Sequence, residues 1–249
     1  MKKLDIALPV LNEESILKKN VMFLYEFLDK NLSDIEWKII IVDNGSSDST
    51  QSLGEYLSKE KPNIEYIRLE ERGRGMALKK AWSKSKADFV SYMDIDLSTD
   101  LSHFLELVSA ILYEDYDLAI GSRLIKDSNV QGRSLFREIC SRGYSFLFRI
   151  MFSTKFHDAQ CGFKVFNISS ISDILRLVKD DEWFFDTELL IIAEKNKYKI
   201  KEIPVKWVDD SDSRVNVTKT IYQDLKGLFR LRFGESACHE HQSTEYLGR

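Results

Sequence analysis

Two carboxylates separated by one residue follow a short apolar segment near the middle of the chain. The segment covers residues 87–93, and the triplet Asp94-Ile95-Asp96 comes directly after it. Carboxylates so placed at the end of a buried strand can converge on a divalent cation together with water and phosphate oxygens. Hard oxygen ligands of this kind suit Mg²⁺ or Mn²⁺. An isolated Asp-x-Asp is more often a solvated loop or a helix cap, so the rest of the chain must decide.

The elements that would position this triplet alternate along the first half of the chain. Strands are expected at 4–10, 37–42, 64–69, 87–94 and 117–121, and helices follow residues 12–15, 43–48, 73–75 and about 100. Such alternation favours an α/β fold with a parallel, doubly wound sheet. Ligands of these sheets lie beyond the carboxyl ends of the strands. Polar clusters at 9–13, 43–48, 94–96 and 121–123 all fall at such ends.

The second half is less regular. We expect an amphipathic basic helix, a loop at 157–162, a strand at 163–166, a helix at 186–195, a strand at 200–208 and a helix at 218–232. No repeat, low-complexity tract or linker divides the chain. The sequence therefore predicts one domain over 1–233, with a polar, frayed tail at 234–249.

Composition limits the function classes. The 249 residues carry a formal net charge of −4 and are 43% hydrophobic. This balance gives no global support for nucleic-acid binding. The three cysteines, Cys140, Cys161 and Cys238, have no metal-type spacing and fit free thiols in a reducing compartment. Without a secretory pattern or an apolar run of roughly 18 residues, the chain is expected to be soluble or to lie on a membrane surface.

The ordered motifs resemble glycosyltransferase family 2 with the GT-A fold, and especially its dolichyl- and polyprenyl-phosphate sugar synthases. The matching stretches are Pro-Val-Leu-Asn-Glu at 9–13, Val-Asp-Asn-Gly-Ser-Ser-Asp-Ser-Thr at 42–50, Gly-Arg-Gly-Met-Ala at 73–77, Asp-Ile-Asp-Leu-Ser at 94–98, Gly-Ser-Arg at 121–123, Asp-Ala-Gln-Cys-Gly-Phe-Lys at 158–164, Phe-Asp-Thr-Glu-Leu-Leu at 185–190, Ile-Pro-Val-Lys-Trp at 203–207 and Ser-Arg-Val at 213–215. Each stretch is weak alone, but the ordered set is specific and spans most of the chain.

The resemblance implies a Rossmann-like, mostly parallel sheet with a nucleotide-sugar half at about 1–123 and an acceptor half at about 124–233. It implies inverting, metal-dependent transfer of glucose or mannose from a UDP- or GDP-hexose to a polyprenyl or dolichyl phosphate. The cofactor would be Mg²⁺ or Mn²⁺. The expected location is the cytoplasmic face of a membrane, held by peripheral contact that is reversible or assisted by a membrane-anchored partner subunit.

The resemblance also implies roles for individual residues. Asp96 is expected to ligate the metal, with Asp94 on the metal or on the ribose. The expected donor-binding residues are Pro9, Leu11, Glu13, Val42, Asn44, Asp94, Ile95, Asp96, Arg123 and Arg214. Asn44 replaces the aspartate that the family usually places under the base, and an amide both donates and accepts. Leu11 replaces the tyrosine of mannosyl members. The 158–164 stretch is more similar to glucosyl members and favours UDP-glucose.

Acceptor-side residues have two interpretations. Asp158, expected to be catalytic with Asp96 and Arg123, would deprotonate a hydroxyl acceptor but would only orient a phosphate acceptor, which is already anionic. Gln160 lies in the same loop. Arg133, Arg137 and Arg142 alternate with aromatic and aliphatic residues, as in an interfacial membrane helix that grips a lipid phosphate. A helix packed on the core with snorkelling arginines is the alternative.

Structural roles compete with several of these assignments. Glu13 could cap a helix, Asp43 and Asp48 could be turn or N-cap residues, and Arg123 or Arg214 could be solvated. Two rival functions stay open: transfer to a glycan or protein hydroxyl, and a non-catalytic nucleotide-sugar-binding subunit. A nicotinamide-dependent Rossmann enzyme is excluded, because residues 9–13 replace the glycine-rich turn after the first strand.

Overall fold

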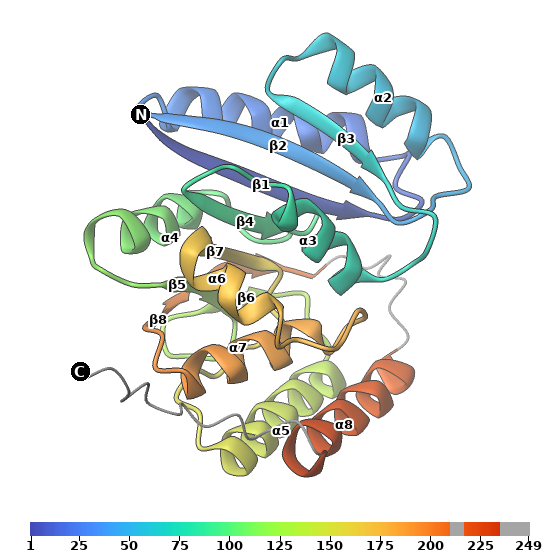
Figure 1. The fold of residues 1–249 in the computed structure, drawn as a ribbon. Coiled ribbons are helices and arrows are strands. Elements are labelled where there is room, and N and C mark those ends of the chain that lie inside the picture. The colour runs from blue at the N-terminus through green and yellow to red at the C-terminus, as the bar shows by residue number, and fades with distance from the viewer. Residues whose placement is uncertain (210–216, 235–249) are drawn as a thin grey trace, which may run out of the picture.

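A seven-stranded sheet organises the molecule (Figure 1). The computed structural model describes residues 1–209 and 217–234. The strand order is β3-β2-β1-β4-β7-β5-β8, and only β7 within this sheet is antiparallel to its neighbours. The strands are β1 (Lys2–Val10), β2 (Ile35–Asp43), β3 (Ile64–Arg68), β4 (Phe89–Met93), β5 (Leu118–Ser122), β7 (Phe163–Asn167) and β8 (Ile200–Pro204). The predicted α/β class with a mostly parallel sheet is confirmed.

Helices cover both faces of this sheet. One face carries α1 (Leu17–Asn31), α2 (Thr50–Glu60) and α4 (Ser102–Tyr113). The other carries α3 (Arg74–Ser83), α5 (Leu135–Phe152), α6 (Ile168–Leu175), α7 (Phe185–Lys195) and α8 (Val217–Phe233). Each face has its own apolar core. The molecule is therefore a three-layer α/β structure, as expected when crossover helices bury both sides of a parallel sheet.

Strand residues alternate between these two cores. In β1, Leu4, Ile6 and Leu8 enter the core beneath α1 and α4, whereas Ala7 enters the core beneath α3 and α7. This follows from the two-residue period of a strand. Both neighbours of β1 pair with it in parallel, with Pro9 opposite Val42. The carboxyl ends of β1, β2 and β4 therefore meet at one edge of the sheet.

Several elements differ from the expectation. The first helix begins at Leu17, later than residues 12–15, because these residues form a loop tied to the segment after β2. The strand expected at 200–208 divides at Val205 into β8 and β9 (Lys206–Val208). Strand β9 pairs with the short strand β6 (Asn129–Gln131) in a separate two-stranded sheet. Neither β6 nor α6 was predicted.

Helices α5 and α8 lie side by side at the edge of the molecule below α7 in Figure 1, and they pack against one another. Phe148 and Phe152 of α5 and Leu228 of α8 enter the second core. Helix α5 begins with an N-cap, since the Ser134 hydroxyl accepts from the backbone N–H of Arg137. Among the described residues, no helix is both long and apolar enough to span a bilayer.

Candidate active site

Loops after β1 and β2 interlock at the carboxyl edge of the sheet. The backbone N–H of Asn12 donates to Ser46 Oγ at 2.9 Å, and the Asn12 side-chain oxygen accepts from Ser47 N–H at 2.7 Å. Glu13 N–H donates to Thr50 Oγ1 at 2.8 Å. Asn12 takes a left-handed conformation with φ of 56°, a geometry that asparagine tolerates better than most residues. These bonds give the edge a defined shape.

Asp43 and Asp48 have structural roles here. Asp43 is fully buried and accepts from Ser46 N–H, from the Tyr66 hydroxyl and from Arg68. Asp48 accepts from the backbone N–H groups of Glu14 and Thr50. Both carboxylates thus hold the loops of this edge together, which is the turn-and-cap alternative considered for them.

Asn44 lies between these loops, and its side-chain oxygen has no hydrogen-bond partner among the described residues. Its N–H donates to Val10 O at 2.9 Å, and only 7% of the residue is exposed. The unpartnered oxygen, Oδ1, is itself buried. An unpaired buried acceptor costs on the order of 1–3 kcal/mol. The structure therefore leaves an amide acceptor at the position where the resemblance places the base.

Other predicted donor-binding residues divide into two groups. Pro9, Leu11 and Glu13 are partly exposed at the strand edge. The Glu13 backbone oxygen accepts from the N–H groups that open α1, so this residue caps the helix through its carbonyl. Val42, near the end of β2, and Ile95, in the turn after β4, are in contrast buried in the two apolar cores. Their side chains support the edge without lining it.

Asp94 and Asp96 follow β4 and line one pocket together with Trp207 and Gly162. Asp94 N–H donates to the Gly162 carbonyl at 3.1 Å, and Asp96 Oδ1 accepts from Ser98 N–H at 2.9 Å. A Cβ at position 162 would lie 2.0 Å from Asp94 Oδ2. Glycine is thus required there, because any side chain would displace the Asp94 carboxylate.

Arg74, at the start of α3, is a site residue that sequence reasoning missed. Its Nη2 lies 2.6 Å from Asp94 Oδ1, and its Nε lies 3.7 Å from Asp186. Its guanidinium also lies over the rings of Tyr92 and Trp183, with centroid distances of 5.3 and 5.1 Å. Residues 73–77 were part of the family resemblance, but the pattern there assigned no role to the arginine. The flanking glycines were the available signal: Gly75 lets α3 approach Phe185 of α7, and Gly73 lets it approach the Asp181 carbonyl.

A buried charge network lies beneath Arg74. Lys164 is fully buried and donates to Asp186 Oδ1 at 2.9 Å, to the Tyr92 hydroxyl at 2.6 Å and to the Cys161 carbonyl at 2.6 Å. The Tyr92 hydroxyl also donates to Asp186. Burial and the nearby Asp186 carboxylate raise the pKa of the Tyr92 phenol well above its usual value. The opposite charges of Lys164 and Asp186 are paired, and the hydrogen-bond network with Tyr92 fixes the side chains beneath Arg74.

The donor set suits a hard divalent cation. Asp94 and Asp96 line one pocket, and Gly162 leaves room for the Asp94 carboxylate. In the described part of the chain, no cluster of three or more His, Cys, Asp or Glu side chains could hold a metal. Water and substrate oxygens would complete such a site, as they commonly do around Mg²⁺. A structural zinc site does not fit this pattern.

Arg123 and Asp158 form a bidentate ion pair beyond β5. Arg123 Nε and Nη2 donate to the two Asp158 oxygens at 2.8 and 3.0 Å, and Arg123 N–H adds a third bond at 3.0 Å. Burial alone would raise the pKa of Asp158, but the Arg123 guanidinium outweighs it and lowers the pKa to about 2. Asp158 is therefore an ionised anchor for Arg123.

Arg123 and Arg133 share the indole ring of Trp207. Their guanidinium carbons lie 5.4 and 5.8 Å from its centroid. Both side chains are mostly buried. Burial and the positive charge of Arg123 lower the pKa of Arg133. Two guanidiniums that repel one another beside one aromatic ring form a place where an anion would be stabilised.

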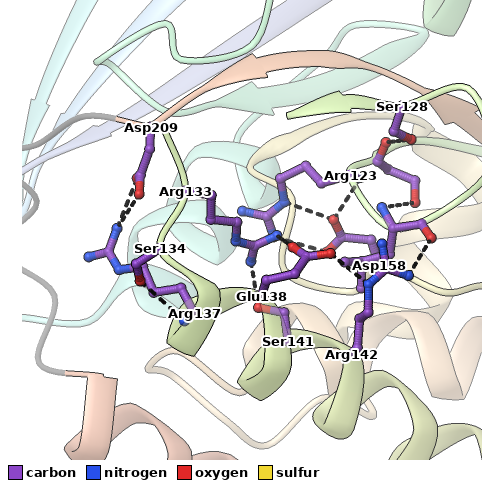
Figure 2. A network of polar contacts seen from close by, with 12 residues as sticks. Arg123, Ser128, Arg133, Ser134, Arg137, Glu138, Ser141, Arg142, Asp158 and Asp209 are labelled. Atoms are coloured by element: carbon purple, nitrogen blue, oxygen red, sulfur yellow. Dashed lines mark hydrogen bonds and ion pairs between the residues drawn. The ribbon is translucent and has the colours of Figure 1, made fainter. Parts of the chain in front are cut away.

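Arg133, Arg137 and Arg142 are also paired with carboxylates (Figure 2). Arg133 and Arg142 flank Glu138 at 3.2 and 2.6 Å. Arg137 contacts Asp209 at 2.8 and 3.0 Å, apart from the others in Figure 2. Among the four predicted arginines, Arg123 and Arg133 are thus brought together at Trp207. Arg142 is at the rim, and Arg137 holds the chain beyond β9.

Gln160 points toward α8, where its side-chain N–H donates to Asp224 at 2.6 Å. Its backbone N–H donates to Asp158 Oδ1 at 3.1 Å. Arg214 lies outside the described residues. Sequence reasoning missed Trp207 and Asp224 as parts of this region. Trp207 stood within a family motif, but Asp224 carried no local signal because its partner is 64 positions away.

The outer faces of α5 and α8 are apolar. On α5 the exposed large side chains recur at helical spacing along one face: Leu135, Phe136, Ile139, Phe146 and Ile150. On α8 the exposed aromatic residues are Tyr222, Phe229 and Phe233, and the last two stack at 6.0 Å. We call these eight residues the apolar face. It lies beside the arginine region, which α5 also helps to build.

The fold and the edge described above define an α/β protein with polar loops at the carboxyl ends of its strands. Its sequence matches the model of the family described as glycosyl transferase family 2 over residues 5–175. The chain therefore belongs to glycosyl transferase family 2, and it is a glycosyltransferase with the GT-A fold. The predicted family, fold and enzyme class are confirmed.

Curated relatives include glycosyltransferase AglD of Haloferax volcanii, 32% identical over 220 residues, which cover 88% of this chain and 35% of AglD. A dolichyl-phosphate beta-glucosyltransferase of Dictyostelium discoideum is 30% identical over 242 residues, covering 92% of this chain and 74% of that enzyme. The chain thus spans about a third of AglD and three quarters of the Dictyostelium protein.

Solved structures support the fold. The crystal structure of glucosyl-3-phosphoglycerate synthase from Mycobacterium tuberculosis, in complex with Mn²⁺, uridine diphosphate and glucosyl-3-phosphoglycerate, has a TM-score of 0.70 to this chain. The match covers 93% of this chain and 80% of that one at 17% identity. At this identity the similarity concerns the fold.

Proposed function

We propose that this glycosyltransferase moves a hexose from a nucleoside-diphosphate sugar to a polyprenyl phosphate with inversion at the anomeric carbon. The observation that carries the proposal is the pair of buried guanidiniums, Arg123 and Arg133, over Trp207. Trp207 also lines the pocket of Asp94 and Asp96. Names of relatives agree with the acceptor, since several are dolichyl-phosphate beta-glucosyltransferases.

The donor would lie along the edge formed by β1, β2 and β4. Asn44 offers a buried acceptor oxygen and an amide donor, which match the N3–H and O4 of uracil. We therefore propose UDP-glucose as the donor, in line with the glucosyl relatives. Asp94 and Asp96 would hold Mg²⁺ or Mn²⁺, which supplies charge neutralisation for the departing diphosphate when bound.

An acceptor phosphate would lie at the arginines. Figure 2 shows four guanidiniums, from Arg123, Arg133, Arg137 and Arg142, facing three carboxylates from Asp158, Glu138 and Asp209, which leaves one net positive charge. A phosphate offers oxygens to both Arg123 and Arg133 and relieves their mutual repulsion. Trp207 connects this position to the carboxylate pocket, which it lines together with Asp94. The two substrates would therefore meet above Trp207.

The proposed transfer requires no strong base. An oxygen of the acceptor phosphate attacks the anomeric carbon, a bond forms between them, and the bond from that carbon to the donor diphosphate breaks. The electron pair leaves on the diphosphate. Asp158, with a pKa of about 2 and both oxygens engaged by Arg123, is a poor proton acceptor near neutral pH. Positioning and charge stabilisation would carry the catalysis.

The apolar face offers a peripheral membrane contact. Exposed aromatic and aliphatic side chains on α5 and α8 lie beside Arg142, Lys226 and Arg232, which are also exposed. Apolar side chains flanked by basic residues are typical of helices that lie in the bilayer interface. We propose that this face rests on the cytoplasmic leaflet and brings the arginines to a lipid-borne phosphate.

A transfer assay tests the proposal. Purified protein with Mn²⁺ or Mg²⁺ is offered UDP-glucose or GDP-mannose together with a short polyprenyl phosphate, the corresponding polyprenol or a sugar acceptor. A thermal-shift series with each nucleotide, with and without chelator, identifies the donor separately, because ligand binding raises the melting temperature. We expect a metal-dependent UDP response and a glucosyl phosphodiester of the lipid.

The hydroxyl-acceptor alternative gives a different result in the same assay. If the product forms on the polyprenol or the sugar acceptor and the polyprenyl phosphate stays unchanged, the acceptor assignment is wrong. Under that alternative, Asp158 would act as the base, and transfer to the hydroxyl acceptor should fall in Asp158→Asn.

A further inference from the structure

A buried carboxyl on α8 contacts the loop that anchors Arg123. Asp224 is 3% exposed, and its Oδ2 accepts from Gln160 Nε2 at 2.6 Å. Its other oxygen, Oδ1, is buried and has no hydrogen-bond partner among the described residues. A buried carboxyl with one satisfied oxygen is costly, so such a residue requires an explanation.

The surroundings of Asp224 are mostly acidic. Asp180 lies before α7, Asp186 lies on α7, and the phenol of Tyr144 faces it from α5. Arg230, on the same helix, is engaged by Glu188 at 2.9 and 3.0 Å and lies 3.7 Å from Asp180. Across the described residues, no ion pair is made by Asp224. Burial raises its pKa to about 7; the hydrogen bond from Gln160 opposes this rise, and Asp180 and Asp186 reinforce it.

A short chain of hydrogen bonds leads from Asp224 to the arginine site. Gln160 bonds Asp224 through its side chain and Asp158 through its backbone N–H. Asp158 in turn holds Arg123 through both carboxylate oxygens. Two residues of one loop thus connect α8, whose outer side belongs to the apolar face, to a guanidinium over Trp207.

We propose that Asp224 is a positioning residue that ties α8 to the loop at Gln160 and thereby sets the geometry of Arg123 for the acceptor phosphate. The effect on the acceptor phosphate rests on the proposed function. The hydrogen-bonded link from Asp224 through Gln160 to Asp158 does not. With its carboxyl neutral, Asp224 accepts from Gln160 without placing a charge beside Asp180 and Asp186. Ionisation above neutral pH adds that charge. A carboxylate accepts more strongly from Gln160, but its repulsion from Asp180 and Asp186 displaces α8, shifts the loop that it holds and weakens acceptor binding.

Two variants separate the bond from the charge. Asp224→Asn keeps an oxygen that accepts from Gln160 but cannot ionise, whereas Asp224→Leu removes the bond. Gln160→Met removes the same bond from the other side. The matched control is Asp29→Asn, which removes one carboxylate from the exposed surface of α1. Each is measured for the KM of a short polyprenyl phosphate, the KM of UDP-glucose and the melting temperature between pH 5 and 8.

We expect Asp224→Leu and Gln160→Met each to raise the acceptor KM about tenfold, the value of roughly one lost hydrogen bond, and the double variant to add little more. The donor KM should stay unchanged. In the wild type, the acceptor KM should rise from pH 6 to 8 relative to Asp224→Asn. A carboxyl whose folded pKa is raised loses stability as pH rises from its unfolded value toward 7, so Asp224→Asn should gain melting temperature over the wild type along that range.

An unchanged acceptor KM in Asp224→Leu, or an equal rise in the donor KM, would overturn the positioning role. A melting-temperature difference between Asp224→Asn and the wild type that is constant from pH 5 to 8 would overturn the role of ionisation. If the wild type transfers nothing to the polyprenyl phosphate, the proposed function fails. The link between Asp224 and Gln160 is then tested by the melting temperature alone. If the losses of Asp224→Leu and Gln160→Met add up in the double variant, the link is wrong.

Discussion

The two ends of the site are built in different ways. On the donor side, the loops that follow the adjacent parallel strands β1 and β2 interlock through hydrogen bonds from backbone N–H groups, such as those of Asn12 and Ser47. On the acceptor side, ion pairs between side chains join the segments, such as Arg123 with Asp158 and Arg137 with Asp209. Carboxylates dominate the first end and guanidiniums the second. This division suits one substrate that brings a metal-bound diphosphate and another that brings a phosphate.

The pairing on the acceptor side also explains how Arg123 and Arg133 are held close together while Arg137 and Arg142 are paired nearby. Each has a carboxylate or an aromatic ring beside it, and their side chains are anchored before any ligand arrives. Preorganised charge of this kind is worth more than mobile surface charge, because no reorganisation is needed when the anion binds. On the donor side, in contrast, one amide oxygen is left unsatisfied.

The largest effect should come from the donor end. Asp96→Ala removes a proposed metal ligand, and we expect kcat/KM to fall roughly 10³-fold, since the metal is credited with several kcal/mol. The measurement is the initial rate of transfer at saturating Mn²⁺. Asp100→Asn is the control, because this nearby carboxylate accepts from the N–H and the hydroxyl of Ser102 and does not line the pocket of Asp94 and Asp96. Equal losses in both variants would contradict the assignment.

The next effect concerns the apolar face. Phe136→Asp combined with Ile139→Asp places two charges where the bilayer interface is expected, and we expect vesicle binding to fall about 100-fold, or roughly 3 kcal/mol. Cosedimentation with anionic vesicles measures it. Phe23→Asp on α1 is the matched control, because Phe23 and Phe136 are equally exposed at 59% and 60%. Activity on a short, water-soluble acceptor should persist.

If the Phe23→Asp control loses vesicle binding to the same extent, the contact is not specific to α5 and α8. The apolar face would then give no support for an acceptor that is held in a membrane.

Asp158→Asn tests the anchor of the acceptor end by stability. Its pKa is lowered from 3.8 to about 2, which corresponds to roughly 2 kcal/mol of folding free energy at neutral pH. A carboxyl with a lowered folded pKa stabilises the protein above its unfolded pKa and loses this effect as pH falls toward 2. The variant should therefore be destabilised at pH 7, and the difference should shrink below pH 4.

Chemical denaturation at several pH values measures this difference. A constant difference from pH 7 to pH 3 would show that the charge of Asp158 is not what stabilises the fold.

The smallest effect should come from Asn44. Asn44→Ala removes the buried acceptor under the proposed base, and we expect UDP binding to weaken about tenfold. Calorimetric titration with UDP and GDP in the presence of Mn²⁺ measures both affinities. A parallel loss for the two nucleotides, or none for UDP, would contradict base reading by this amide.

Much of the donor end could be predicted from the sequence. Its residues follow strands with clear periodicity, and parallel strands bring their carboxyl ends to one edge, so 9–13, 43–48 and 94–96 were expected to meet. The exceptions are Val42, which β2 directs into one core because a strand alternates its faces, and Ile95, which enters the other core from the turn after β4. Arg74 was missed, since a turn pattern does not reveal an ion pair with Asp94.

The acceptor end could be predicted only in part. The basic, aromatic pattern indicated α5 and its exposed apolar residues. It could not show which arginines converge, because that depends on β6, β9 and the loop at 157–162, which are placed by tertiary contacts. Strand β7 is antiparallel within a parallel sheet, and Asp224 reaches Gln160 across 64 positions. Such pairings are set by topology and leave no local periodicity.

The most direct test of the central claim concerns Arg133, the guanidinium that joins Arg123 over Trp207. In Arg133→Gln, we predict that the KM of a short polyprenyl phosphate rises about tenfold or more, as expected when one charge-assisted hydrogen bond is lost, while the KM of the nucleotide sugar stays unchanged. A rise in the donor KM with no change for the acceptor would contradict the account.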